Sequence, residues 1–378
     1  MAPLSEFPFA EQASGSHVGR RDFLKTIIMA AAAVGLPFSA ANQIAEAIVA
    51  GVKPSVIWLH FQECTGCTES LLRANNPDLA QLILQLISLD YHETLAAAAG
   101  TQVEAALHDA MERNAGKYVC VVEGSIPTKE MGIYCKIGGR TATEVMGDVA
   151  GKAGAIIAIG SCASWGGVQS SSPNPTGAVG VPEFLGKKIV TIPGCPPNPY
   201  NFLGVVLQYV TFGKLPALDE LGRPMFAYGR VIHTDCPRRS HYDTGRFAER
   251  FGDANHRQGY CLYKLGCKGP VTHANCSLAN YCNIPGTWPV GTGHPCVGCT
   301  EKGVAFTEAI FKTADIPRPR PSWLVPPIQA GQRVVSPLAT GVGGLLVGAG
   351  VTAATLLSER VVRKLDEKEK PDKDQQEG

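Results

Sequence analysis

Residues 55–70 read SVIWLHFQECTGCTES, an apolar run that ends just before a Cys-x-x-Cys pair. Further short apolar runs typical of strands follow at 83–91, 118–122, 155–159 and 188–192. Helix-forming stretches alternate with these runs, around 71–72 and at 103–113, 141–149 and 201–210. This alternation predicts an α/β domain over residues 52–214, with a doubly wound, mainly parallel sheet.

Four cysteines follow strands of this predicted sheet. Cys64 and Cys67 come after the first strand, Cys162 after the fourth and Cys195 after the fifth. Because the carboxyl ends of parallel strands meet at one edge of a sheet, these positions converge on one patch. Glycines that let the backbone approach a bulky ligand lie beside them, at 66, 160, 166, 167 and 194. Four thiolates at one edge suit a zinc ion or an iron–sulfur cluster.

Residues 215–315 form a second predicted domain, in which strand and helix patterns fade while cysteine, histidine, glycine and proline become frequent. Its ligand-type residues are His233, Cys236, Cys261, Cys267, Cys276, Cys296 and Cys299. They divide most simply into one site of four ligands and one site of three. Because apolar periodicity is weak here, we expect bound metal to supply much of the stability of this domain.

The composition excludes several classes of function. The 378 residues include 13 cysteines, an odd number that cannot be fully paired as disulfides within the chain. The formal charge is +1, so no basic surplus is present to neutralise the phosphates of a nucleic acid. Apolar residues make up 45% of the chain, which excludes intrinsic disorder and predicts a sizeable core.

Residues 1–47 are predicted to be a twin-arginine signal peptide. The stretch 19–25, GRRDFLK, is followed by an apolar run at 26–41 and by small residues suited to cleavage. The twin-arginine route exports folded proteins, so a cofactor held by cysteines is inserted in the reducing cytoplasm before export. The alternative interpretation is a chance arginine pair ahead of an N-terminal helix.

The C-terminal part is predicted to anchor the protein in the inner membrane. Residues 334–358 contain no ionisable side chain and are long enough to span a bilayer as one transmembrane helix. Arg360, Arg363 and Lys364 follow, which assigns the tail 359–378 to the cytoplasm by the positive-inside rule. With 316–333 as a linker, the body would lie on the periplasmic side. The alternative is a buried, glycine-rich helix of a soluble domain.

Five segments resemble the small subunit of nickel–iron hydrogenases. They are ECTGCTES at 63–70, GSCASWGG at 160–167, PGCPPN at 193–198, GCKG at 266–269 and GHPCVGC at 293–299. The resemblance extends over about residues 55–312. Both end segments match the membrane-bound, periplasmic uptake members of that family.

The resemblance implies a flavodoxin-like first domain followed by a loop-rich iron–sulfur domain, with two [4Fe-4S] clusters and one [3Fe-4S] cluster. The proximal [4Fe-4S] cluster would be bound by Cys64, Cys67, Cys162 and Cys195. The distal [4Fe-4S] cluster would be bound by His233, Cys236, Cys261 and Cys267. The medial [3Fe-4S] cluster would be bound by Cys276, Cys296 and Cys299, with Pro289 near the position of the missing fourth ligand.

Cys120, Cys135 and Cys282 are left without a cluster. Cys120 lies within a strand-like run and is expected to be a core thiol, whereas Cys135 lies in a loop without a partner pattern. Cys282 lies between two medial ligands, so [4Fe-4S] is an alternative for the medial cluster. Oxygen-tolerant members carry two extra cysteines at positions matching Gly66 and Gly167, so the resemblance implies an oxygen-sensitive enzyme.

The resemblance also implies the partners. Dihydrogen would be split at a nickel–iron centre in a separate large subunit, so this chain contributes no catalytic residue of its own. Electrons would leave through the proximal, medial and distal clusters toward a quinone-linked or cytochrome b membrane subunit, with a ferredoxin-like subunit as a further candidate. Glu63 and Thr65 are candidates for moving protons at the subunit boundary or for capping the following helix.

Two other classes of function stay open on the sequence. One is a stand-alone, exported multi-cluster electron-transfer protein without hydrogen activity. The other is a structural zinc or disulfide protein of the cell surface, against which the odd cysteine count and the export signal argue. The cluster-bearing subunit of respiratory NADH dehydrogenase shares the first-domain design, but it lacks the export signal and the second domain.

Overall fold

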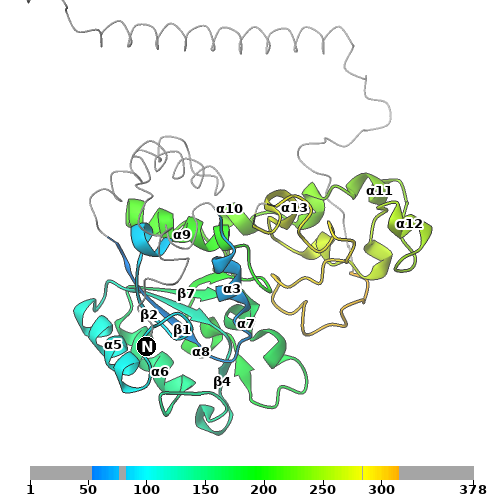
Figure 1. Cartoon of the computed structure of the whole chain (residues 1–378). Helices are drawn as coiled ribbons and strands as arrows, with labels where there is room; N and C mark the ends of the chain where they lie inside the picture. The colour runs from blue at the N-terminus through cyan, green and yellow to red at the C-terminus, as the bar shows by residue number, and fades with distance from the viewer. Residues whose placement is uncertain (1–52, 76–81, 283, 315–378) are drawn as a thin grey trace, which may run out of the picture. The chain divides into compact units, whose positions relative to one another are not determined.

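The computed structural model of the protein describes residues 53–75, 82–282 and 284–314. A five-stranded parallel sheet with the strand order β2-β1-β3-β7-β9 forms the centre of the first region (Figure 1). Its strands are β1 (Ser55–His60), β2 (Ser88–His92), β3 (Val119–Glu123), β7 (Ala155–Ile159) and β9 (Val190–Ile192). This is the strand order of a flavodoxin-like doubly wound sheet. The predicted parallel α/β fold is therefore confirmed.

Strand β1 lies between β2 and β3, and all six of its residues are buried. A strand covered on both faces is expected to be continuously apolar, as SVIWL is. The prediction of a strand from residue 83 was wrong, because Leu82–Leu86 form a π-helical turn, η2. The parallel pairing begins where Ser55 meets Ser88, so the residues before Ser88 have no strand partner in β1.

Helices cover both faces of the sheet. They are α3 (Gly66–Leu72), α5 (Thr101–Arg113), α6 (Ala142–Lys152), α7 (Gly160–Trp165), α8 (Val181–Leu185) and α9 (Pro199–Phe212). Helices α3 and α9 lie on one face, and α5 and α6 lie on the other (Figure 1). On the α9 side Phe202 packs edge-on against Trp58, with ring centroids 5.4 Å apart, and both side chains are fully buried.

Local signals set the ends of the longer helices. Thr141 and Glu144 form a capping box at the start of α6. Asn198 caps α9, which begins with Pro199 and ends at Gly213 in the left-handed conformation. Short ladders and turns fill the loops between them: β4 (Ile126–Pro127) with β8 (Ala178–Val179), β5 (Lys136–Ile137) with β6 (Arg140–Thr141), η3 (Lys129–Gly132) and η4 (Gly167–Ser170).

The second region is built from short turns of helix. They are α10 (Met225–Tyr228), η5 (Ile232–Asp235), α11 (Arg239–Asp243), α12 (Ala254–Arg257), η6 (Tyr263–Leu265), η7 (Gly269–Val271) and α13 (Cys276–Ala279). Apolar residues of this region, such as Ile232, Leu262 and Trp288, belong to the same buried cluster as the α9 side of the sheet. The two regions therefore share one apolar core within one compact unit.

No helix in the described part of the chain is both long and apolar enough to cross a bilayer. Four predicted segments lie outside the described residues: the signal peptide 1–47, the linker 316–333, the membrane helix 334–358 and the tail 359–378.

Candidate metal centres

The four cysteines predicted for the proximal cluster come together at the carboxyl edge of the sheet, and we call them the edge group. Cys64 and Cys67 lie at the start of α3, Cys162 lies in α7 just after β7, and Cys195 follows β9. Burial raises the pKa of the Cys67 thiol, and the negative charges of Glu123 and the other three thiolates raise it further. Such mutual effects require the four thiols to lie close together.

Glycine makes room for these sulfur atoms. A Cβ atom on Gly160 would lie 2.4 Å from the Sγ of Cys67, and one on Gly167 would lie 2.5 Å from the Sγ of Cys162. Both glycines also have positive φ angles, +84° and +58°, which L side chains rarely adopt. Any larger residue at either position would displace a thiol of the edge group.

Glu123, which sequence reasoning missed, anchors the first Cys-x-x-Cys loop. This buried carboxylate at the end of β3 accepts the backbone N–H of Cys67 at 2.9 Å and the N–H of Thr68 at 3.1 Å. It also accepts the Thr68 hydroxyl at 2.6 Å and the Trp58 indole N–H at 3.2 Å. The signal in the sequence is a single acidic residue that closes the apolar run YVCVVE.

The three cysteines predicted for the medial cluster, here the middle group, line one cavity of about 380 Å³. Cys276, Cys296 and Cys299 lie in its wall together with Cys195 of the edge group, and Pro289 and Trp288 form another part of it. Burial raises the pKa of Cys276 and of Cys299 to about 12, so the metal-free thiols are neutral at pH 7. The cavity is mostly apolar, with a few convergent sulfur atoms, which is the environment expected around a bound cluster.

The four residues predicted for the distal cluster form the outer group. Burial and the nearby Cys267 raise the pKa of Cys236 to about 11 and that of Cys261 to about 12. The Nε2 atom of His233 is buried and has no hydrogen-bond partner among the described residues. Burial, aided by Arg239, lowers the pKa of His233 to about 4, so its ring is neutral and keeps a lone pair for a metal.

Direct contacts join the three groups in series. Cys195, in the edge group, and Cys299, in the middle group, line the same cavity, and after burial the nearby thiols of Cys276 and Cys195 raise the pKa of Cys299 further. The backbone N–H of Cys296, in the middle group, donates to the Sγ of Cys267 in the outer group at 3.3 Å. The middle group therefore lies between the other two and touches both.

A serine reinforces the first of these junctions. The Ser161 hydroxyl donates to the carbonyl of Cys299 at 2.6 Å and accepts the Gly194 N–H at 3.1 Å. Ser161 precedes Cys162, and Gly194 precedes Cys195, so one side chain ties two edge-group loops to the middle group. Sequence reasoning did not find this role.

Two buried cations fasten the loops that carry the other ligands. Arg223 forms ion pairs with Asp219 at 2.7 Å and Glu301 at 2.8 Å, and it also donates to the carbonyl of Thr300, the residue after Cys299. Lys268 is fully buried, and its three N–H groups are shared among four backbone carbonyls within hydrogen-bond distance, those of Gly266, Ala309, Ile310 and Lys312. These contacts hold the chain on either side of the middle and outer groups.

The remaining cysteines lie apart from the three groups. Cys120 is fully buried in the core on the α5 and α6 side of the sheet, as expected for a core thiol. Cys135 is half-buried, and burial together with Glu93 and Glu63 raises its pKa to about 11. Cys282 is buried, but among the described residues it is Pro289 and not Cys282 that lines the middle cavity.

The donor chemistry fits iron–sulfur clusters. All 13 cysteines are free thiols, eleven predicted ligands fall into three groups, and the cavity of the middle group has room for a bulky inorganic ligand. The parallel sheet and the three groups define the class of protein: an α/β protein whose clustered cysteines are suited to binding iron–sulfur centres.

Comparisons with known proteins narrow this class. Residues 64–209 match the family described as NADH ubiquinone oxidoreductase, 20 Kd subunit, which confirms the shared design of the first domain. Residues 228–312 match the family that describes the C-terminal part of the NiFe/NiFeSe hydrogenase small subunit. The chain is 49% identical over 357 residues to the Hydrogenase-2 small chain of Escherichia coli K12, covering 94% of this chain and 95% of that one.

Two further matches are also hydrogenases. The quinone-reactive Ni/Fe-hydrogenase small chain of Wolinella succinogenes is 46% identical over 286 residues, covering 75% of this chain and 80% of that one. The reduced, active Ni-Fe-Se hydrogenase of Desulfomicrobium baculatum superposes with a TM-score of 0.62 at 36% identity, covering 66% of this chain and 95% of that chain. The chain belongs to the small subunits of nickel–iron hydrogenases, which are electron-transferring iron–sulfur proteins that pair with a large subunit.

Proposed function

We propose that this small subunit holds two [4Fe-4S] clusters, in the edge and outer groups, and one [3Fe-4S] cluster, in the middle group. When bound, these clusters carry single electrons from H2 oxidation at the nickel–iron centre of the large subunit to an acceptor at the membrane. The residues of this chain position the clusters and set their surroundings, and the catalytic centre belongs to the partner.

One observation carries this proposal. The middle group lines a cavity between the other two groups and contacts both, through Cys195 on one side and Cys267 on the other. Four cysteines line that cavity, of which Cys195 is assigned to the edge group; the other three, Cys276, Cys296 and Cys299, with Pro289 in the wall, suit a cluster with three protein ligands. Electron transfer between separate centres needs such a close succession, and zinc held for structure alone would not.

Location and partners follow from the segments at the chain's ends and from the named relatives. We propose export by the twin-arginine route, anchoring by residues 334–358, and a position on the periplasmic side of the inner membrane. One relative is named periplasmic and another quinone-reactive, which supports a quinone-linked membrane subunit as the acceptor. A ferredoxin-like subunit is a second candidate for this role.

Sensitivity to oxygen follows from two glycines. Gly66 and Gly167 stand where the oxygen-tolerant members of the family carry extra cysteines, and a Cβ atom on Gly167 would lie 2.5 Å from the Sγ of Cys162. We therefore propose an ordinary proximal cluster with four cysteine ligands and an enzyme that loses activity in air.

Electron paramagnetic resonance of membranes that contain both subunits tests the proposal. After mild oxidation we expect a near-isotropic [3Fe-4S] signal, which disappears when hydrogen gas is admitted. The variant Cys299→Ser should lose this signal, whereas Cys120→Ser, in the apolar core, should keep it. Cluster signals that ignore hydrogen would contradict the coupling to the large subunit. Intact protein without any iron–sulfur signal would overturn the proposal.

A further inference from the structure

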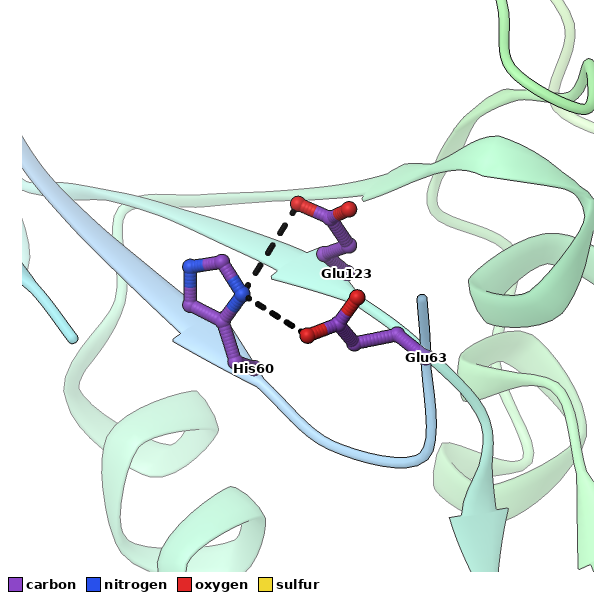
Figure 2. A group of neighbouring side chains, drawn as sticks. All are labelled: His60, Glu63 and Glu123. Carbon is purple, nitrogen blue, oxygen red and sulfur yellow. Dashed lines mark ion pairs between the residues drawn. The ribbon is translucent and has the colours of Figure 1, made fainter. Parts of the chain in front are cut away.

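Two clusters of polar side chains lie beside the proposed metal centres without supplying ligands. One is formed by His60, Glu63 and Glu123, which are at most 14% exposed and bind the Cys67 loop from within, so it is closed to another protein (Figure 2). The other lies at the outer group and reaches the surface. We call it the arginine face, and it consists of Arg238, His241, Arg246 and Tyr260.

Hydrogen bonds fix the arginine face to the outer group. The Arg238 guanidinium donates to the carbonyl of Tyr260, the residue before Cys261, at 2.9 Å. The backbone N–H of Cys261 donates to the carbonyl of Arg246 at 3.2 Å. Arg238 also follows Cys236 by two positions in the sequence. The face therefore lies directly beside two of the four predicted ligands of the outer group.

Aromatic and polar contacts orient the exposed side chain of Arg246. Its guanidinium carbon lies 5.6 Å from the ring centroid of Tyr260, and its Nε donates to the Thr244 hydroxyl at 3.0 Å. The ring of His241 stacks on that of Tyr260, with centroids 4.9 Å apart. The two terminal nitrogens of Arg246 form no hydrogen bond in the described part of the chain. A guanidinium that is already oriented loses little freedom when it binds a carboxylate.

The arginine face carries positive charge that the chain does not balance. A guanidinium is protonated at any ordinary pH. Among the described residues, neither Arg238 nor Arg246 has an ion-pair partner. Asp243 and Glu249 are exposed acids of the same stretch, but each is paired with another cation. The face is therefore free to attract negative charge from outside the chain.

A protein surface rich in carboxylates is the partner that this face fits best. Arginine and tyrosine are enriched at the centres of protein interfaces, and a planar guanidinium binds a carboxylate through two parallel hydrogen bonds. A lipid surface fits less well, because no large apolar side chain is exposed between residues 226 and 250 to enter a bilayer. A lysine-rich partner would be repelled by the face.

We propose that the arginine face docks an acidic electron-accepting protein, whose carboxylates contact Arg238 and Arg246 and bring its redox centre next to the outer group. The inference rests on the proposed function, because it takes the outer group as the point where electrons leave the subunit. It adds the charge of the partner and the residues that bind it. One H2 oxidised to two protons releases two electrons, so it reduces two one-electron acceptors in turn.

Ionic strength tests the proposal on the wild-type heterodimer. The probe is an oxidised, acidic [2Fe-2S] ferredoxin, and a lysine-rich cytochrome c is its opposite in charge. With H2 as the electron donor, the second-order rate of ferredoxin reduction should fall as salt is added, because salt screens the attraction. The rate for cytochrome c should rise or stay constant. A ferredoxin rate that is independent of salt or rises with salt would overturn the proposal.

Substitution of Arg246 tests the assignment to this face. Arg246→Gln should lower the ferredoxin rate several-fold at low salt, with the iron content and the electron paramagnetic resonance spectrum of the wild type. Arg246→Lys keeps the charge and should retain more of the rate. Arg113→Gln removes the same charge from an exposed position of α5 and is the matched control. Equal losses of rate in Arg246→Gln and Arg113→Gln would contradict the proposal, and if Arg246→Gln does not assemble, the wild-type salt series decides.

Two further outcomes separate the kind of partner from the proposed function. The heterodimer is placed in bilayers of phosphatidylcholine, with or without phosphatidylglycerol. An effect of Arg246→Gln that appears only with the anionic lipid, and equally for both acceptors, would assign the face to a lipid surface and overturn the proposal. If both proteins are reduced at equal rates at every salt concentration, the inference fails and the proposed function stands. An iron-loaded heterodimer that reduces neither protein under H2 would instead contradict the proposed function.

Discussion

The two regions of this subunit hold their ligands in opposite ways. The sheet region, residues 55–212, has a buried five-stranded sheet and helices of up to 14 residues, and two thiols of its edge group, Cys64 and Cys195, are exposed. The second region, residues 225–314, contains no helix longer than five residues in its described part, yet Cys261, Cys267 and Cys296 are buried. Cys267 and Cys296 even belong to the apolar core.

This difference separates two kinds of metal site. In the sheet region the apolar core forms the fold and delivers thiols to an edge. In the second region two of the predicted ligands, Cys267 and Cys296, are core residues, so bound metal would replace apolar contacts that short turns cannot supply. Without metal, burial raises the pKa of these thiols, and the region would have to bury several neutral thiols around a cavity of about 380 Å³.

Removing the iron should produce the largest difference in stability between the two regions. Structural metal sites contribute on the order of 10 kcal/mol to folding, so chelation should unfold residues 225–314 while the sheet persists. Hydrogen exchange with mass spectrometry on the heterodimer, before and after iron removal, measures this. Equal loss of protection in β1, β3 and the second region would refute the distinction.

Weakening the core should affect the sheet region instead. Phe202→Ala leaves a cavity against Trp58 and should cost about 3–5 kcal/mol, seen in calorimetry as a fall in Tm of about 10 °C. Iron content should be retained in the protein that folds. Leu215→Ala, at a 38% exposed position, is the matched control and should melt close to the wild type. A larger fall in the control than in Phe202→Ala would count against this assignment of the core.

Breaking a buried ion pair probes the junction between the regions. Arg223→Met removes the cation that Asp219 and Glu301 share, leaving Asp219 without an ion-pair partner and Glu301 with His273 alone, and should cost about 3 kcal/mol. The measurement is Tm of the heterodimer together with the intensity of the [3Fe-4S] signal. Lys264→Met, which removes an exposed pair with Glu249, should leave both unchanged. Similar losses of Tm and of signal intensity in the two variants would show that the buried ion pairs of Arg223 contribute no more than an exposed ion pair.

Removing a single hydroxyl group should lower the stability by less than removing Arg223. Ser161→Ala removes the hydrogen bonds to Cys299 and Gly194 and should cost about 1 kcal/mol, or a fall in Tm of about 2–4 °C. Ser240→Ala, at an exposed position of α11, serves as the control. A Tm identical to the wild type would mean that the other contacts suffice to join the edge and middle groups.

The smallest expected effect is on acid stability. Because His92 has a pKa of about 3 when folded and 6.5 as its ordinary value, the unfolded chain binds more protons between these limits. Stability from the neutral His92 is therefore complete above pH 6.5 and is lost as the pH falls toward 3. In His92→Gln, Tm should decline less between pH 6.5 and 5 than in the wild type or in His108→Gln. Parallel declines of Tm in the wild type, His92→Gln and His108→Gln would rule out a contribution of the neutral His92 to acid stability.

Much of the fold was predictable because the sheet is buried on both faces. Continuous apolar runs such as residues 55–61 mark parallel strands, and loops after such strands meet at one edge, so the edge group could be expected from the chain alone. The error at 83–87 arose because an apolar run shows burial but does not distinguish a strand from a helical turn.

The remaining parts of the site depend on residues that meet only in the folded chain. Glu123 binds the N–H of Cys67 across 56 positions of sequence, and Ser161 reaches Cys299 across 138. No local pattern encodes such meetings. The row of hydrogen-bonded side chains that leads from Glu123 through Thr68 and His92 to His60 likewise forms only in the folded protein, and no spacing in the sequence reveals it.

The central claim is that three thiol groups hold three separate iron centres in series. Diffraction from crystals of the heterodimer at wavelengths on either side of the iron absorption edge tests it most directly. We expect three iron peaks in this subunit, one within the edge group, one in the cavity lined by Cys276, Cys296 and Cys299, and one beside His233. Zinc in place of iron, or an empty cavity at the middle group in active enzyme, would contradict the claim.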